Sequence, residues 1–336
     1  MIGFKQIEFF DHTGITKERQ LRHRVATRTA CRERRVTTEG MIAKLFLLGT
    51  MIATALFAQS QPILGEDVVK VSDHVWAIMG WPNIAIVVGR RATLVVDTGL
   101  GSRNGATIAR VAAKLAPSNP KRFLTTTHFH PEHASGEGGF PPGTIVIRNA
   151  VQQHEMEAHG KEVIDQFAGR SAQFKELLAD ATLRSPDVTF EQEARLDLGG
   201  VTALLLWFGG AHTKGDQLTL IEPDRTLISG DVVQNQVVPS IFRDGGTPSS
   251  WIAVLDKITA LNVAHVLPTH SAPGDGSLVA AEKRFITDLR SSALELKKKG
   301  VAVEDAGKRL EVEFKGKYPT WPSMNVAGFV RSIYSE

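Results

Sequence analysis

The stretch TTTHFHPEHASG, residues 125–136, concentrates metal-capable side chains within six positions. These side chains are His128, His130, Glu132 and His133. The preceding run KRFLTTT (121–127) is rich in apolar and β-branched residues, which predicts a strand that leads directly to the first histidine. Proteins of the α/β class place their ligands just beyond the C-terminal ends of strands. The stretch is therefore predicted to form part of a ligand site.

The spacing of these side chains favours metal binding. In an extended segment, side chains two positions apart point the same way, so His128 and His130 can bind one ion. Glu132 and His133 follow Pro131 and can turn toward a second ion nearby. Neutral imidazoles and carboxylates suit Zn²⁺, and Mn²⁺ or Fe²⁺ are compatible with the same donors.

Other predicted strands lead to residues of the same kind. ATLVVDTG, RTLISGD and AHVLPTH each predict one strand, and RLDLGGVTALLLWFGGAHTKGD predicts a strand pair with a glycine turn. The residues at the ends of these strands are Asp97, Asp231, His270 and His212. With the 128–133 cluster, five predicted strand ends carry ligand-type side chains, and this coincidence is the strongest functional signal in the sequence.

The order of these motifs resembles that of a known family. H-x-H-x-E-H, AHTKGD, SGDVV and LPTH, preceded by VVDTG, are similar to the motifs of the metallo-β-lactamase superfamily over roughly residues 67–275. The resemblance implies an α/β (α+β) fold, namely a four-layer αβ/βα sandwich. It also implies a two-metal site on the rim between the two sheets.

The resemblance implies a role for each residue of the motifs. The first metal would be bound by His128, His130 and His212. The second would be bound by Glu132, His133 and His270. Asp231 would bridge both ions together with a water or hydroxide. Asp97 would orient a ligand histidine without touching the metal. Asp216, in AHTKGD, is expected to be a structural hydrogen-bond partner.

Glu132 departs from the family pattern, which nearly always has Asp at this position. The extra methylene moves the carboxylate outward by about 1.5 Å, whereas metal–oxygen distances tolerate only about ±0.2 Å. The side chain must fold back, the loop must lie further away, or the second metal is held differently. We expect the first, with a weaker second site. Glu132 is also placed to carry a proton to the leaving group, so Glu132 and Asp231 are the predicted catalytic carboxylates.

The resemblance predicts a zinc-dependent hydrolase with two ions per chain, in which a hydroxide bridging the metals attacks a small-molecule substrate. Lactones, thioesters, β-lactams and sulfate esters all fit. Asp231 disfavours β-lactams, because β-lactam-hydrolysing members usually have Cys or Ser there. Two alternatives remain. One is a catalytically weak periplasmic accessory protein with a degraded second metal site, and the other is a mononuclear iron oxygenase on the same fold.

Charge and cysteine content narrow the function classes further. Residues 1–40 carry nine Lys and Arg against five acidic residues, which leaves the rest of the chain close to neutral although the whole chain is +3. Nucleic acid is therefore not an expected partner. The single cysteine, Cys31, also lies in this segment. Thiol catalysis and cysteine-ligated zinc are excluded from the remainder.

The start of the chain predicts export. Residues 41–58 have one early Lys, an apolar run and small residues at the end, which is typical of a secretory signal peptide. We interpret residues 1–40 as an upstream extension, with Met41 as the start. Residues 59–336 would then form one periplasmic or secreted domain with a helical insertion at 151–184, C-terminal helices at 278–336 and no stable membrane span after signal cleavage. The sequence does not predict an oligomeric state.

Overall fold

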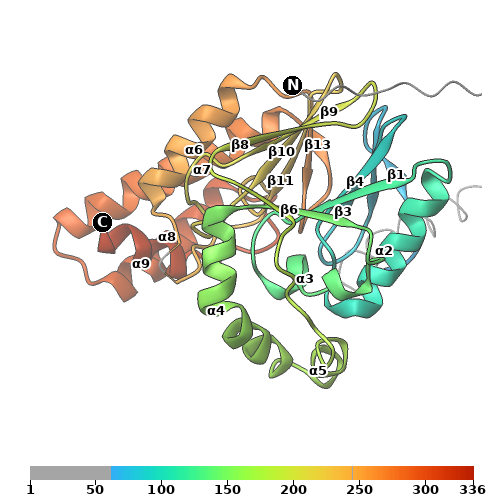
Figure 1. The fold of residues 1–336 in the computed structure, drawn as a ribbon. Helices are drawn as coiled ribbons and strands as arrows, with labels where there is room; N and C mark the ends of the chain where they lie inside the picture. Colours follow the sequence, from blue (N-terminus) through green and yellow to red (C-terminus); the bar gives the residue numbers. More distant parts are fainter. Residues whose placement is uncertain (1–61, 244) are drawn as a thin grey trace, which may run out of the picture. The chain divides into compact units, whose positions relative to one another are not determined.

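The computed structural model of the protein describes residues 62–243 and 245–336. The predicted signal peptide and the upstream extension lie outside the described residues. The described part has a mixed α/β fold in which two sheets pack face to face and helices cover both outer faces (Figure 1). This arrangement confirms the predicted fold class.

The first sheet has seven strands in sequence order. They are β1 (Val69–Lys70), β2 (Val75–Ile78), β3 (Ile84–Val88), β4 (Ala92–Val96), β5 (Lys121–Thr125), β6 (Ile145–Asn149) and β7 (Val188–Phe190). Strands β1 to β4 pair antiparallel, and β4 to β7 pair parallel. A parallel pair needs a crossover, which helix α2 (Gly101–Leu115) provides between β4 and β5. The carboxyl ends of β4 and β5 therefore meet at one edge.

The second sheet has six strands in the order β13-β12-β11-β10-β9-β8. They are β8 (Glu193–Asp197), β9 (Thr202–Leu206), β10 (Leu218–Glu222), β11 (Thr226–Gly230), β12 (His265–Pro268) and β13 (Gly274–Asp275). Strands β8 and β9 form a hairpin whose turn contains Gly199 and Gly200, with φ of 88° and 83°. Only β11 and β12 pair parallel, so their carboxyl ends also lie side by side.

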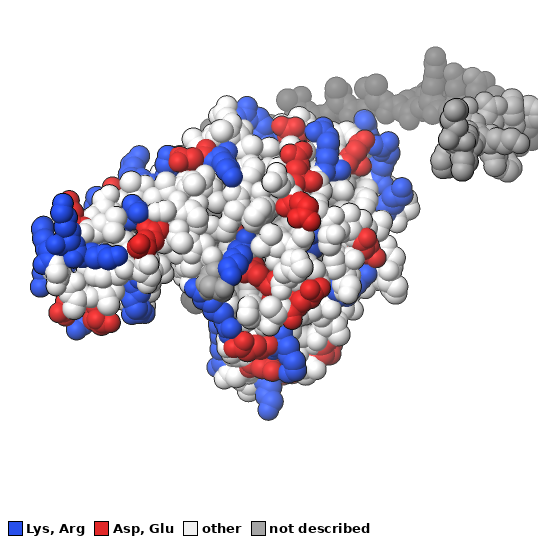
Figure 2. Space-filling model, turned by 60° about the vertical axis from the view of Figure 1, so that its left-hand side comes forward, with Lys and Arg blue, Asp and Glu red and all other residues white. Residues whose placement is uncertain are grey.

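The remaining elements are helical. They are α3 (Pro131–Ala134), the 3₁₀ helix η1 (Glu137–Gly139), α4 (Ala150–Ala168), α5 (Ala172–Leu177), α6 (Pro248–Ala260), α7 (Ser277–Lys298), α8 (Val303–Lys317) and α9 (Ala327–Ser335). The predicted insertion at 151–184 thus contains two helices, and these extend away from the sheets below α3 (Figure 1). Among the described residues, no helix combines the length and the apolar character needed to cross a bilayer. Acidic and basic side chains are interspersed over most of the face shown in Figure 2.

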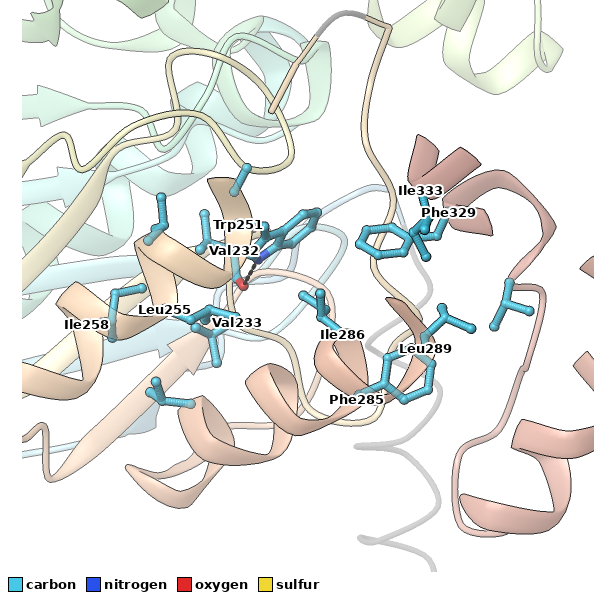
Figure 3. Packing of buried hydrophobic residues seen from close by; sticks show 14 of the residues in the cluster. Val232, Val233, Trp251, Leu255, Ile258, Phe285, Ile286, Leu289, Phe329 and Ile333 are labelled. Atoms are coloured by element: carbon cyan, nitrogen blue, oxygen red, sulfur yellow. Dashed lines mark hydrogen bonds between the residues drawn. The ribbon is translucent and has the colours of Figure 1, made fainter. Parts of the chain in front are cut away.

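Alternation of side chains along the strands produces the four layers. Leu94 of β4 and Leu205 of β9 are fully buried in the cluster between the two sheets. Val95, one position along β4, packs instead in the outer cluster with Ile108 of α2. On the other side, the second sheet is covered by α6 and the C-terminal helices. There Trp251 lies in the core and donates a hydrogen bond of 3.0 Å to the carbonyl of Val232 (Figure 3).

Glu282 is an acidic residue on the buried face of α7. Its side chain is 1% exposed, and neither carboxyl oxygen has a hydrogen-bond partner among the described residues. Burial raises the pKa of Glu282 well above its usual range. The folded protein therefore keeps a proton at pH values where the unfolded chain has lost it, and stability falls as pH rises above the unfolded pKa.

Replacing Glu282 by glutamine should remove this pH dependence. Relative to the unchanged protein, E282Q is expected to gain unfolding free energy as pH rises above about 5, at up to about 1.4 kcal/mol per pH unit, until pH passes the folded-state pKa of Glu282. Denaturant unfolding between pH 5 and 8 measures the difference. E295Q, at an exposed position on the same helix, is the control. Parallel stability curves for E282Q and the unchanged protein would contradict the prediction.

Candidate metal centre

Three histidines from two loops converge on one point. His128 and His130 follow β5, and His212 lies in the loop between β9 and β10. The Nε2 atom of His128 is 2.9 Å from Nδ1 of His130, and Nε2 of His212 is 3.3 Å from the same atom. All three residues are buried. They are called the first group below, and they are the residues predicted to bind the first metal.

A second convergence involves α3 and the end of β12. Glu132 and His133 lie on α3, which begins at Pro131, and His270 follows β12. The Nε2 atoms of His133 and His270 are 3.3 Å apart, and Oε1 of Glu132 is 4.0 Å from Nε2 of His133. These three residues, called the second group, are those predicted for the second metal. The longer Glu132 side chain thus reaches the group while its carboxylate stays 5% exposed.

Asp231 lies between the two groups. It follows β11, and its Oδ2 is 3.5 Å from Nε2 of His212 in the first group. Its Oδ1 is 3.4 Å from Nε2 of His270 and 3.9 Å from Nε2 of His133 in the second group. One carboxylate oxygen therefore faces each group, which is the placement that a bridging ligand needs.

The distances between the donor atoms suit the binding of metal ions. Ligand atoms bound tetrahedrally to zinc at about 2.1 Å lie about 3.4 Å from one another. The observed separations of 2.9–3.3 Å between histidine nitrogens are slightly shorter than this value. Glu132 Oε2 is also buried without a hydrogen-bond partner among the described residues.

The histidines of the first group also have the protonation state that metal binding needs. His212 Nδ1 donates to the carbonyl of Ser240 at 2.6 Å, so its Nε2 presents a lone pair to the first group. Burial lowers the pKa of His128 and His130 well below the usual range, which keeps both rings neutral. Converging lone pairs repel one another unless a cation lies between them, so a metal ion fits this donor set.

Charge interactions also distinguish the two carboxylates. Burial raises the pKa of Glu132 to about 7, although the neighbouring His133 opposes this shift. Burial acts in the same direction on Asp231, but the imidazoles of His270, His212 and His133 outweigh it and lower the pKa of Asp231 below its usual range. Asp231 is therefore the carboxylate held more firmly in its charged form.

Asp97 orients a histidine of the second group, as the resemblance implies. It follows β4 with a φ of 72°, and its Oδ2 accepts a 2.9 Å hydrogen bond from Nδ1 of His133. It also accepts hydrogen bonds of 2.7 and 3.0 Å from the backbone N–H and the hydroxyl of Thr127. These contacts fix the His133 ring so that its Nε2 faces the second group.

Replacing Asp97 by asparagine should weaken metal binding. D97N loses the charged acceptor for His133, and loss of such a partner typically lowers metal affinity by about 10–100-fold. Competition with a chromophoric chelator measures the affinity of each site. Because His133 belongs to the second group, the second ion is expected to be affected more than the first. An unchanged affinity for both ions would show that Asp97 serves only the turn after β4.

Two residues that the sequence analysis missed hold Asp231 in place. The Gln234 amide donates to Oδ1 of Asp231 and to the Thr269 hydroxyl, while its carbonyl accepts from the backbone N–H of His270. Thr269 in turn donates to Oδ1 of Asp231 at 2.5 Å. One side chain thus links the ends of β11 and β12. A Gln three residues after Asp231 carries no signal for this role in a single sequence.

The His212 loop needs a correction to its predicted position. The strand before it was expected to end at His212, but β9 ends at Leu206 and the residue lies in a loop. Asp216 fixes this loop by accepting hydrogen bonds from the backbone N–H groups of Ala211 and Thr213, the structural role expected for it. Glu155 of α4 accepts from the backbone N–H groups of Lys214 and Gly215.

A hollow opens beside the second group. Its volume is about 350 Å³, and the residues that line it are Asn235, Gln236, Val237, His270, Ser271, Ala272 and Pro322. On the other side of His270, the Trp81 ring lies with its centroid 5.4 Å from the imidazole. His270 of the second group therefore borders both a hollow and an aromatic side chain.

Comparison with known proteins identifies a family and several similar proteins. A family model described as the metallo-beta-lactamase superfamily matches residues 80–270, a range that includes every residue of both groups. The linear primary-alkylsulfatase of Pseudomonas sp. (strain ATCC 19151) is 25% identical, and the match covers 54% of this chain and 40% of that protein.

Solved structures show the same fold. A metallo-beta-lactamase from Pontibacter korlensis has a TM-score of 0.54 at 19% identity and covers 67% of this chain and 99% of that one. A stereoselective inverting sec-alkylsulfatase from Pseudomonas sp. has a TM-score of 0.60 at 16% identity and covers 80% of this chain and 49% of that one. The chain thus spans half or less of the length of these alkylsulfatases.

Proposed function

Because the chain belongs to the metallo-beta-lactamase superfamily, we propose that it is a zinc-dependent hydrolase of small ester-like substrates. In this proposal, the first and second groups each hold one ion. The observation that carries the proposal is the placement of Asp231, with one carboxylate oxygen 3.5 Å from the first group and the other 3.4 Å from the second. A carboxylate in this position serves two ions at once.

In the proposed reaction, different residues of the chain would have different roles. When bound, the ions supply Lewis acidity toward an ester oxygen and make hydroxide available at neutral pH. Asp231 fixes the separation of the two groups, and Gln234 and Thr269 hold its carboxylate. Glu132 keeps one buried oxygen without a protein partner, so it is placed to pass a proton to the leaving group.

The substrate class is an ester-like bond in a lactone, thioester, sulfate ester or β-lactam. Two similar proteins are named as alkylsulfatases, which supports testing sulfate esters first. Two structural neighbours are named as metallo-beta-lactamases, which keeps β-lactams in the panel. Asp231 counts against β-lactams, because β-lactam-hydrolysing members of the superfamily usually have Cys or Ser at this position.

The test is hydrolysis of a panel by the purified protein with and without a chelator. The panel contains a chromogenic cephalosporin, a lactone, a thioester and an aryl sulfate. Turnover of at least one compound that stops on chelation and returns with zinc would support the proposal. No turnover by protein that holds two ions would contradict the hydrolase assignment. Turnover of the cephalosporin alone would show that the argument from Asp231 is wrong.

Metal content separates the proposal from its two alternatives. Two zinc ions per chain, measured by elemental analysis, are expected for the hydrolase. One weakly held ion, without turnover of the panel, would favour the accessory protein with a degraded second site. A single iron ion would favour an oxygenase, since such enzymes need a redox-active metal.

We further propose that the protein is exported. The apolar, signal-like run at residues 41–58 supports this proposal. Expression of the full chain with a C-terminal tag, followed by cell fractionation and N-terminal sequencing, tests it. A mature N-terminus near residue 59 in the periplasm or medium is expected. Uncleaved protein in the cytoplasm would contradict export.

A further inference from the structure

Four aromatic side chains lie beside the histidines of the two groups. These side chains, called the aromatic rim, are Trp81, Phe167, Phe174 and Phe242. The Phe242 and Phe167 rings lie 4.4 and 6.2 Å from the His130 ring, measured between centroids. Trp81 lies 5.5 Å from Phe174 and contacts His270 as described above. Three of the four rim residues are partly exposed, so an apolar molecule can reach them beside the metal ligands.

Two arginines stack on this rim, and they differ in their partners. The Arg170 guanidinium lies 3.4 Å from the Phe167 ring centroid, and that of Arg243 lies 5.3 Å from the Phe242 centroid. Arg243 also forms an ion pair with Glu162, with one N–O distance of 3.0 Å. Arg170 is exposed and has no carboxylate partner among the described residues. It is therefore the rim cation whose charge no neighbouring acid offsets.

Phe167 connects Arg170 to the metal ligands. Its ring centroid lies 3.4 Å from the Arg170 guanidinium and 6.2 Å from that of the His130 ring. Arg170 is therefore separated from the first group by one aromatic ring. A guanidinium stacked on a ring by its face keeps its N–H groups free at its edge, where they can donate to two oxygens of one anion.

The segment that carries the rim is fixed to the metal centre. Phe167 lies in the last turn of α4, Arg170 lies two residues beyond the end of that helix, and Phe174 lies on α5. Asn149, which caps α4, donates to the carbonyl of Gly215 at 2.9 Å. With the contacts of Glu155 and Glu162, this bond holds α4 against the loops after β9 and β11. The positions of the ring and the cation are thus set relative to the metal ligands.

We propose that Arg170 and the aromatic rim form a subsite for substrates that carry both an apolar chain and an anionic group. The subsite rests on the proposed hydrolase function, because its occupant is the substrate of that reaction. The apolar chain of the substrate lies against the partly exposed rings of Trp81 and Phe174, and the anionic oxygens receive hydrogen bonds from Arg170. The anion is either the reacting sulfate group or a carboxylate elsewhere in the substrate.

Binding of a stable anion tests the subsite independently of turnover. Hexane-1-sulfonate and hexan-1-ol share a chain but differ in charge, and calorimetry measures the affinity of each. R170A is expected to weaken sulfonate binding at least about 10-fold, the change expected when a charge-assisted hydrogen bond is lost, and to leave hexanol binding unchanged. R170K, which keeps the charge without the planar fork, should fall between the two.

The control is K161A, which removes a positive charge from an exposed position on α4. An unchanged sulfonate affinity in R170A, or an equal loss in K161A, would overturn the subsite. Replacing Trp81 by phenylalanine should abolish any quenching of tryptophan fluorescence by the bound sulfonate while R170A still weakens binding. Quenching that persists in W81F would place the chain elsewhere and overturn the assignment of the rim.

Turnover distinguishes the source of the anion. Hexyl sulfate has its charge at the reacting centre, monophenyl adipate has a remote carboxylate, and phenyl hexanoate is neutral. R170A should lower kcat/KM about 10-fold for the substrate whose anion the subsite binds and leave phenyl hexanoate unaffected. An equal loss on all three would overturn the subsite. If the unchanged protein hydrolyses none of them, the proposed hydrolase function fails, while sulfonate binding that depends on Arg170 still supports the subsite.

Discussion

Replacing Asp231 by asparagine is expected to remove nearly all hydrolytic activity. Both groups lose a charged oxygen at once, because each Asp231 oxygen faces a different group. Removing one preorganised electrostatic contact from an active site typically costs about 10²–10³ in kcat. Since Asp231 would serve two ions in the proposed function, kcat/KM should fall by at least about 10³-fold, and the metal content should drop below two ions per chain.

Kinetics with the best substrate of the panel and elemental analysis of the same sample measure both effects. D165N is a suitable control, because it makes the same change of charge at an exposed position on α4. A D231N protein that keeps two ions and more than a tenth of the original activity would rule out a shared ligand at this position. Retention of two ions with lost activity would assign Asp231 to the reaction and not to metal binding.

Replacing Arg148 by methionine should have the largest effect on stability. Arg148 of β6 and Glu137 of η1 form an ion pair in which both residues are 0% exposed. Arg148 also donates to the carbonyl of Arg184 at 3.0 Å. Without the guanidinium, Glu137 would be a buried and uncompensated charge, which typically costs about 3–5 kcal/mol. R148M is expected to lower the unfolding free energy by that amount in denaturant titrations.

A double variant separates the charge effect from the loss of packing. In R148M/E137Q, the buried acid is gone, so the double variant should be more stable than R148M alone. The amide at position 137 can still accept from the backbone N–H of Arg184, which Glu137 now accepts at 2.7 Å. If the double variant is as unstable as R148M, the cost lies in packing around β6 and the charge argument is wrong.

The sequence could predict the fold class because the strands that carry ligands are short apolar runs with a polar end. Strand β11, for example, lies entirely within RTLISGD, and α7 begins one residue before its predicted start. Strands β6, β7, β10 and β13 were not predicted. Two of these have only two or three residues, too few for a periodic pattern to appear.

The candidate site likewise contains residues that could be predicted from the sequence and residues that could not. Its histidines and carboxylates were named in advance because their residue types are rare and their order follows a family pattern. Gln234 and Arg170 could not be named, because each acts through residues that only the fold brings near. Glu137 and Arg148 are eleven positions apart and look like ordinary surface charges in the sequence. Their burial depends on how η1 packs beside β6.

In the proposed function, Arg170 and two rings of the aromatic rim lie on a part of the chain separate from the metal ligands. All residues of the two groups lie on loops and on α3 beyond the ends of sheet strands, whereas α4 and α5 belong to neither sheet. A protein engineer could therefore exchange residues 157–178 for a segment from a relative and change selectivity without rebuilding the metal centre. The exchange must keep Asn149 and Glu155, because these two side chains anchor α4 to the loop that carries His212.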